Sequence, residues 1–140
     1  MSLHKTPYLS TEFYAQYKEL YVEWRTTQNM SEEEHLKTVS IFLDCLNQYQ
    51  PTHLLSNFTN AYYLASPTHQ KLLIQKCKGC FAANFLEKVA IIVSTDYMVE
   101  MIIEKIVSKL QQIFSFEVEY FFDSQAAIVW LRSLTFETEA

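Results

Sequence analysis

One short segment of the chain, residues 88–94 (KVAIIVS), is apolar without alternation. Its β-branched side chains suit a strand that is covered on both faces, as strands of parallel sheets are. Ser94, at the end of this segment, is followed by Thr95 and Asp96, and residues of these types often begin a helix. The pattern therefore predicts an interior parallel strand that leads into a helix.

Four further segments are predicted to be strands. Apolar and polar residues alternate over residues 20–25 and 116–122, which is the period of a strand with unlike faces. A weaker pattern near residues 12–17 predicts an edge strand paired antiparallel with residues 20–25. Residues 53–58 predict a strand that ends in a polar loop. We therefore expect a sheet of about five strands.

Four helices are predicted between and after these strands. The first begins with a capping box made by Ser31 and Glu34, and Pro51 ends its apolar stripe. The other three are expected to begin at the cap-type residues Ser66, Asp96 and either Asp123 or Ser124. The order ββαβαβαβα implies an α/β fold with a mostly parallel sheet and right-handed crossovers. One domain accounts for residues 1–140, with a core at about 12–134 and a polar tail at 135–140.

Composition narrows the function classes. The formal net charge of −5 argues against non-specific nucleic-acid binding. No apolar run approaches the roughly 18 residues that span a bilayer, and three cysteines, an odd number, suggest reduced thiols and a cytoplasmic location. Gly79 is the only glycine, which excludes Gly-rich phosphate loops and the Gly-flanked nucleophile elbow. Aromatic residues make up 15% of the chain, so we expect some of them at a surface or an interface.

The residues that often carry chemistry do not form a catalytic constellation. Cys77 and Cys80 are predicted to lie late in a helix, where the helix dipole disfavours a thiolate, so we expect packed thiols; a thiol oxidoreductase is a distant alternative. The four histidines have no metal-ligand spacing, and His35 and His69 are expected to be exposed in first helical turns. We therefore predict no enzyme activity, no cofactor and no metal.

Three segments together resemble a known group of proteins. They are LYVEWR at 20–25, AIIV at 90–93 and YFFDSQAAIVWL at 120–131. In this order they resemble small bacterial STAS-like proteins, whose fold occurs in sulfate-transporter tails and in antagonists of anti-sigma factors. The resemblance implies a STAS-like sandwich and a non-catalytic regulatory module that binds a protein partner or forms a homodimer.

One family feature does not carry over to this chain. Regulatory STAS domains have a phosphorylatable serine in an Asp-Ser-Ser/Thr-Gly segment between the third strand and the next helix. Here the corresponding residues 56–61 are SNFTNA, with neither the acid nor the glycine. The resemblance therefore does not extend to the family's phosphorylation switch.

The candidate binding residues lie where strands are predicted to end. In open α/β sheets, ligands bind outside the carboxyl ends of the strands, and helix N-termini with free amides meet there. The residues predicted at this edge are Asn57, Thr59, Asn60, Tyr62, Tyr63, Ser66, Thr95 and Asp96. The alternative interpretation is that they serve only as caps and loops.

A second function is compatible with the same sequence. The chain has enough aromatic side chains to line a pocket between the sheet and the helices, which would bind a small apolar ligand. The candidate lining residues are Tyr21, Trp24, Tyr63, Phe81 and Phe121. The two hypotheses, an interaction module and a ligand-binding protein, remain open at this point.

Overall fold

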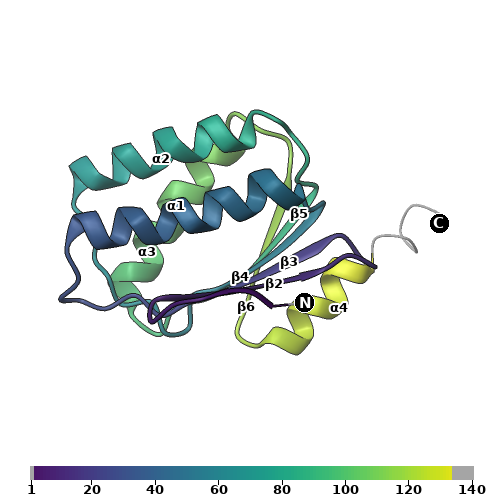
Figure 1. Cartoon of the computed structure of the whole chain (residues 1–140), viewed down its shortest axis with the longest axis horizontal. Helices are drawn as coiled ribbons and strands as arrows, with labels where there is room; N and C mark the ends of the chain where they lie inside the picture. The colour runs from purple at the N-terminus through teal and green to yellow at the C-terminus, as the bar shows by residue number, and fades with distance from the viewer. Residues whose placement is uncertain (1, 134–140) are drawn as a thin grey trace.

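A mixed sheet of six strands organises the chain. The computed structural model describes residues 2–133, and in it the strands lie in sequence order from β1 to β6 (Figure 1). The first three pair antiparallel, and β3 to β6 are parallel. The strands are β1 (Ser2–Lys5), β2 (Leu9–Tyr14), β3 (Glu19–Trp24), β4 (His53–Asn57), β5 (Lys88–Ile92) and β6 (Glu117–Phe121).

The prediction of about five strands was wrong by one, because β1 was missed. This strand is four residues long, largely exposed and at the edge of the sheet, so it carries too few apolar positions to show a period. The first predicted strand, at 12–17, lies instead at Leu9–Tyr14. Its alternation is hidden because the polar Thr11 is fully buried beside β3.

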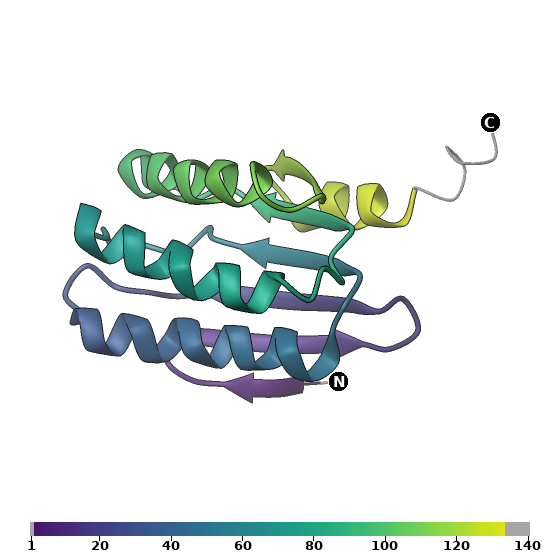
Figure 2. The ribbon, with the colours of Figure 1, turned by 90° about the horizontal axis from the view of Figure 1, so that it is seen from above.

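Four helices cover the two faces of the sheet unequally. They are α1 (Glu32–Tyr49), α2 (Pro67–Phe81), α3 (Tyr97–Gln111) and α4 (Ser124–Arg132). The first three lie on one face, and α4 lies on the other (Figure 1). Seen from above, α1, α2 and α3 follow one another side by side (Figure 2). The helix order and the α/β class agree with the prediction.

Side-chain caps fix where the helices begin, as the sequence predicted. Ser31 and Glu34 form the reciprocal capping box of α1. Ser66 caps α2 with a proline at the first helical position, and Asp96 accepts a hydrogen bond from the Val99 amide at the start of α3. Asp123, rather than Ser124, caps α4. Each cap satisfies an amide that the first helical turn leaves unpaired.

Strand β5 separates two apolar cores, which confirms that it is covered on both faces. Val89 and Ile91 belong to the larger core under α1, α2 and α3. Ala90 and Ile92 belong to a smaller core under α4. Even Lys88 is buried, with its Nζ donating to the Trp130 carbonyl at 2.9 Å and lying 4.4 Å from the Trp130 ring centre.

An ion pair fastens the end of α4 to the sheet. Glu19 on β3 is 0% exposed, and Arg132 donates to its two carboxylate oxygens at 2.9 and 3.2 Å. The Tyr21 hydroxyl donates to the same carboxylate at 3.1 Å, and His53 Nδ1 lies 3.8 Å from it. Burial alone would raise the pKa of Glu19, but His53, Arg132 and Tyr21 together hold it below its ordinary value.

Candidate functional site

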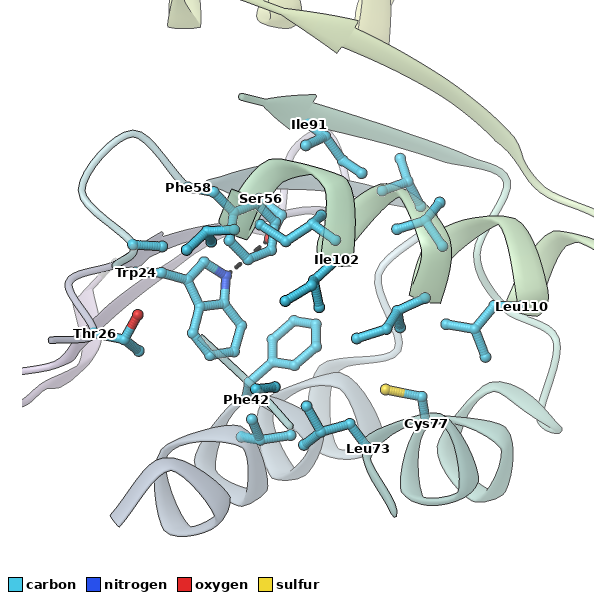
Figure 3. Close-up of a pocket in the computed structure, with 18 of the residues that line it drawn as sticks. Trp24, Thr26, Phe42, Ser56, Phe58, Leu73, Cys77, Ile91, Ile102 and Leu110 are labelled. Carbon is cyan, nitrogen blue, oxygen red and sulfur yellow. Dashed lines mark hydrogen bonds between the residues drawn. The ribbon is translucent and has the colours of Figure 1, made fainter. Parts of the chain in front are cut away.

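The structure contains an apolar cavity of about 150 Å³ between the sheet and helices α1, α2 and α3 (Figure 3). Side chains from β3, β4, β5, all three helices and the loop after β4 line it. Six of its lining residues are Phe, Tyr or Trp, namely Trp24, Phe42, Phe58, Tyr63, Phe81 and Phe116. Protein interiors seldom contain voids larger than a water molecule, so the cavity is a conspicuous departure from close packing.

The position of α3 accounts for the cavity. The backbone of α3 has its contacts chiefly with α2, whereas α4 lies directly over β5 and β4 on the other face. Val99 and Leu110, near the two ends of α3, are buried in the cavity wall, whereas the lining side chains between them are only partly buried: Ile102, Ile103, Ile106 and Val107. Helix α3 thus roofs the cavity with aliphatic side chains rather than filling it.

Two hydrogen bonds hold polar groups in the cavity wall. The Trp24 indole Nε1 donates to Ser56 Oγ at 2.9 Å, and both residues are buried. The backbone amide of Tyr63 donates to Thr26 Oγ1 at 3.4 Å. These bonds fix the indole of β3 against β4 and tie the loop after β4 to the end of β3.

Two histidines meet beside the cavity. His35 Nδ1 and His69 Nε2 lie 2.9 Å apart, and the Tyr63 ring stacks on His35 with the ring centres separated by 4.2 Å. His69 is only 3% exposed and His35 is partly buried, so the prediction that both are exposed was wrong. Burial and the neighbouring His69 lower the pKa of His35 to about 4, which leaves this imidazole neutral at neutral pH.

The sequence held a signal for this pair that spacing alone did not reveal. Each histidine lies in the first turn of its helix, four residues after the cap Ser31 in α1 and three after the cap Ser66 in α2. Both helices connect parallel strands, so they run in the same direction and begin at the same edge of the sheet. Two histidines in the first turns of adjacent parallel helices were therefore candidates for contact.

The predicted edge residues come together in part. Asn57 Oδ1 accepts hydrogen bonds from the amide and the hydroxyl of Thr59, at 3.0 and 2.6 Å. The hydroxyls of Tyr62 and Thr95 lie 3.1 Å apart, and Thr95 also donates to the Thr59 carbonyl. These contacts join the carboxyl ends of β4 and β5, and they occupy many of the polar groups that were predicted to bind a partner. Asp96 serves as the cap of α3.

The other predicted edge residues turn toward α1. Tyr63 stacks on His35, and the Ser66 hydroxyl donates to Glu32 Oε1 at 3.2 Å. Asn60 is exposed in the loop. The proposed edge is thus divided between the β4–β5 junction and the start of α1, and partner binding at either part stays a prediction.

Only some of the predicted aromatic lining residues reach the cavity. Trp24, Tyr63 and Phe81 line it as expected. Tyr21 and Phe121 lie on the other face of the sheet, against the core under α4. Strand alternation explains the correction, because Tyr21 neighbours Trp24 on β3 at an odd spacing and must point to the opposite face.

The cysteine thiols are buried, as predicted. Cys77 lines the cavity, and burial raises the pKa of its thiol to about 12. Burial and Asp44 raise the pKa of Cys80 to about 11, and its Sγ lies 3.3 Å from Asn47 Oδ1. At neutral pH both thiols are protonated and therefore poor nucleophiles.

Residues 2–133 contain no cluster of three or more His, Cys, Asp or Glu side chains suited to a metal ion. Nor does this part of the chain include a helix long and apolar enough to cross a bilayer. Comparison with known proteins gives no match to a family model, to a curated protein or to a solved structure.

Proposed function

We propose that this protein binds a small apolar molecule in the cavity between the sheet and helices α1, α2 and α3. The observation that carries the proposal is the cavity itself, with a volume of about 150 Å³ and a nearly continuous apolar wall. An apolar cavity of roughly this size stays free of water and accepts benzene. The ligand we expect therefore has about six to eight non-hydrogen atoms.

The energetic penalty of an empty cavity supports the same proposal. Enclosed voids destabilise proteins by about 24 cal/mol per Å³, so a volume of about 150 Å³ sets an upper limit of about 3–4 kcal/mol for this cavity, which is partly open to solvent. Whole domains are stable by only about 5–15 kcal/mol. A ligand that fills the cavity restores the missing contacts and stabilises the folded state by mass action.

The two tryptophans allow a direct test with bromobenzene, whose heavy atom quenches indole fluorescence on contact. Trp24 lines the cavity, whereas Trp130 lies on α4 across the sheet. In a Trp130→Phe variant, which retains only Trp24, we expect quenching that saturates with ligand concentration. In the matched Trp24→Phe variant we expect only the weak, linear quenching caused by collisions.

The melting temperature provides a second readout that does not depend on fluorescence. Bromobenzene should raise the melting temperature of the wild-type protein as its concentration increases. Equal, unsaturable quenching in both single-tryptophan variants, with no change in melting temperature, would contradict the proposal.

As a second function we propose the STAS-like interaction module, acting in the cytoplasm without catalysis. It is supported by the sequence resemblance and by large apolar side chains on the exposed side of α3. Tyr97 is 75% exposed, and Met98 and Met101 are about half exposed. Exposed methionine and aromatic side chains of this kind are enriched at protein interfaces.

Sedimentation velocity tests this second function. We expect the wild-type protein to form a dimer and Met101→Lys to be monomeric, because a buried lysine opposes an apolar contact. A wild-type monomer that also retains no partner in an affinity purification from its native cell would contradict it.

A further inference from the structure

The polar groups of the cavity gather toward one end. Figure 3 shows Thr26 and Ser56 toward the end opposite to Leu110. Tyr63 belongs to the same end, since its amide donates to Thr26, and so does His35, on which its ring stacks. A ligand in this cavity therefore meets hydrogen-bonding groups at one end and hydrocarbon along the rest.

The two hydroxyls at this end are hydrogen-bond donors without an acceptor. Ser56 Oγ accepts from the Trp24 indole and Thr26 Oγ1 accepts from the Tyr63 amide, so each oxygen already has a donor. Within residues 2–133, neither hydroxyl donates its own hydrogen to another group. A hydroxyl in this state favours an acceptor, such as a carbonyl or ether oxygen of a ligand.

The wall carries no charge that would bind an ionised head group. The lining includes no lysine, arginine, aspartate or glutamate. His35 is neutral at neutral pH because of its burial and its contact with His69. Burial is the main cause of the raised pKa of Tyr63, and the negative charge of Glu32, just outside the cavity, raises it further. A carboxylate would lose its hydration here without gaining a cation.

We infer that the ligand is a neutral amphiphile, an apolar body of about six carbons with one carbonyl or similar acceptor that binds at the Thr26 or the Ser56 hydroxyl, and not a carboxylate. This inference rests on the proposed function, because it names the ligand class for the same cavity. The acceptor would receive the hydrogen of one of these two hydroxyls, while the hydrocarbon would lie under the aliphatic side chains of α3.

A matched pair of probes tests the ligand class. Hexan-2-one and hexanoate have six carbons each, and at about pH 8 only hexanoate is charged. Each is titrated against bromobenzene bound to the Trp130→Phe protein, and displacement is read as recovery of Trp24 fluorescence. We expect hexan-2-one to displace bromobenzene at a concentration at least about tenfold lower than hexanoate.

Variants at the polar end test the binding position. Thr26→Val and Ser56→Ala each remove one donor, and the loss of the donor that the ligand uses should weaken hexan-2-one by about three- to tenfold relative to bromobenzene, which has no carbonyl to accept a hydrogen bond. Thr26→Ser keeps the hydroxyl and should retain the affinity, which separates a lost hydrogen bond from a disturbed fold.

The outcomes separate this inference from the proposed function. If bromobenzene does not bind at Trp24, the proposed function fails. If bromobenzene binds but hexanoate competes as well as hexan-2-one, only the ligand class is wrong. If the ketone competes better but neither Thr26→Val nor Ser56→Ala weakens it, the inferred position of the acceptor is overturned.

Discussion

Filling the cavity from its walls should raise the stability of the folded protein while it weakens ligand binding. Val39 on α1 and Val99 on α3 are buried, and both line the cavity. Replacing each with leucine adds one methylene group that has space to enter. Most substitutions in a well-packed core destabilise the protein, so an increase in stability is an uncommon result that specifically reports empty space.

The expected magnitude follows from the volume of the cavity. A buried methylene group contributes about 0.8 kcal/mol, so the double variant should gain about 1–2 kcal/mol after allowance for imperfect fit. The upper limit is about 3–4 kcal/mol, the penalty of the whole void of about 150 Å³. Leucine also has a higher helix propensity than valine by a few tenths of a kcal/mol.

A matched control variant measures how much the higher helix propensity of leucine contributes to stability. Val129 lies on α4 and is 65% exposed, so Val129→Leu changes the helix propensity without filling a void. Urea unfolding, followed by circular dichroism, gives the free energy of unfolding of all variants. Bromobenzene should bind the Val39→Leu/Val99→Leu protein at least about tenfold more weakly, because the added groups occupy its site.

Two results would refute this reasoning. A loss of about 1–3 kcal/mol in the double variant would show overpacking, and hence that the walls enclose no usable space. A gain no larger than twice that of the single change Val129→Leu would show that the added methylene groups do not enter the cavity.

Three further changes have defined outcomes. Arg132→Ala should lower the free energy of unfolding by about 2–4 kcal/mol, measured in urea, because it leaves the buried Glu19 carboxylate without its cation. The pKa of Glu19 is lowered in the folded protein, so the stability that this carboxylate contributes is present at neutral pH and is lost as the pH falls through that pKa. Because the pKa of His35 is lowered to about 4, the unfolded chain binds more protons than the folded protein between about pH 6.5 and 4. The free energy of unfolding should therefore decrease as the pH is lowered through this window. His35→Phe should flatten the pH profile of the free energy of unfolding, measured in urea, over the same window. Gln50→Gly should stabilise the protein by about 0.5–1 kcal/mol in thermal unfolding, because Gln50 ends α1 with a φ of 42°, whereas Gln48→Gly inside the helix should destabilise it by about 1 kcal/mol.

Much of the fold was predictable because its determinants are local. Each helix begins at a side chain that accepts a hydrogen bond from the amide three residues later, and such caps can be recognised in a short segment. The uninterrupted apolar run of β5 likewise records that both faces are covered. Strand β1 was missed since its place is fixed by pairing with β2 rather than by its own pattern.

The site depends on contacts between segments that are far apart in the sequence. The sequence predicted only some of these contacts. Apolar periodicity predicted that α3 faces the sheet, but it carries no information on how closely α3 approaches. The contact of His35 with His69 joins residues 34 positions apart. Both features follow from the packing of α1, α2 and α3 against one another, which is a property of the layer and not of any one segment.

The two faces of β5 are packed differently. Toward α4, Ala90 and Ala127 belong to the same small core and both are fully buried, and α4 lies directly on β5.

Toward the other helices, two pairs of large rings contribute to the cavity wall. Trp24, which ends β3, stacks on Phe58 after β4 with ring centres 5.5 Å apart. Phe81, which ends α2, meets Phe116 before β6 at 5.7 Å. The first pair lies where strands end and the second where they begin. The rings of both pairs line the cavity, together with Val89 and Ile91 of β5. The cavity is therefore built by the side chains that border it, which is the arrangement expected of a preformed binding site.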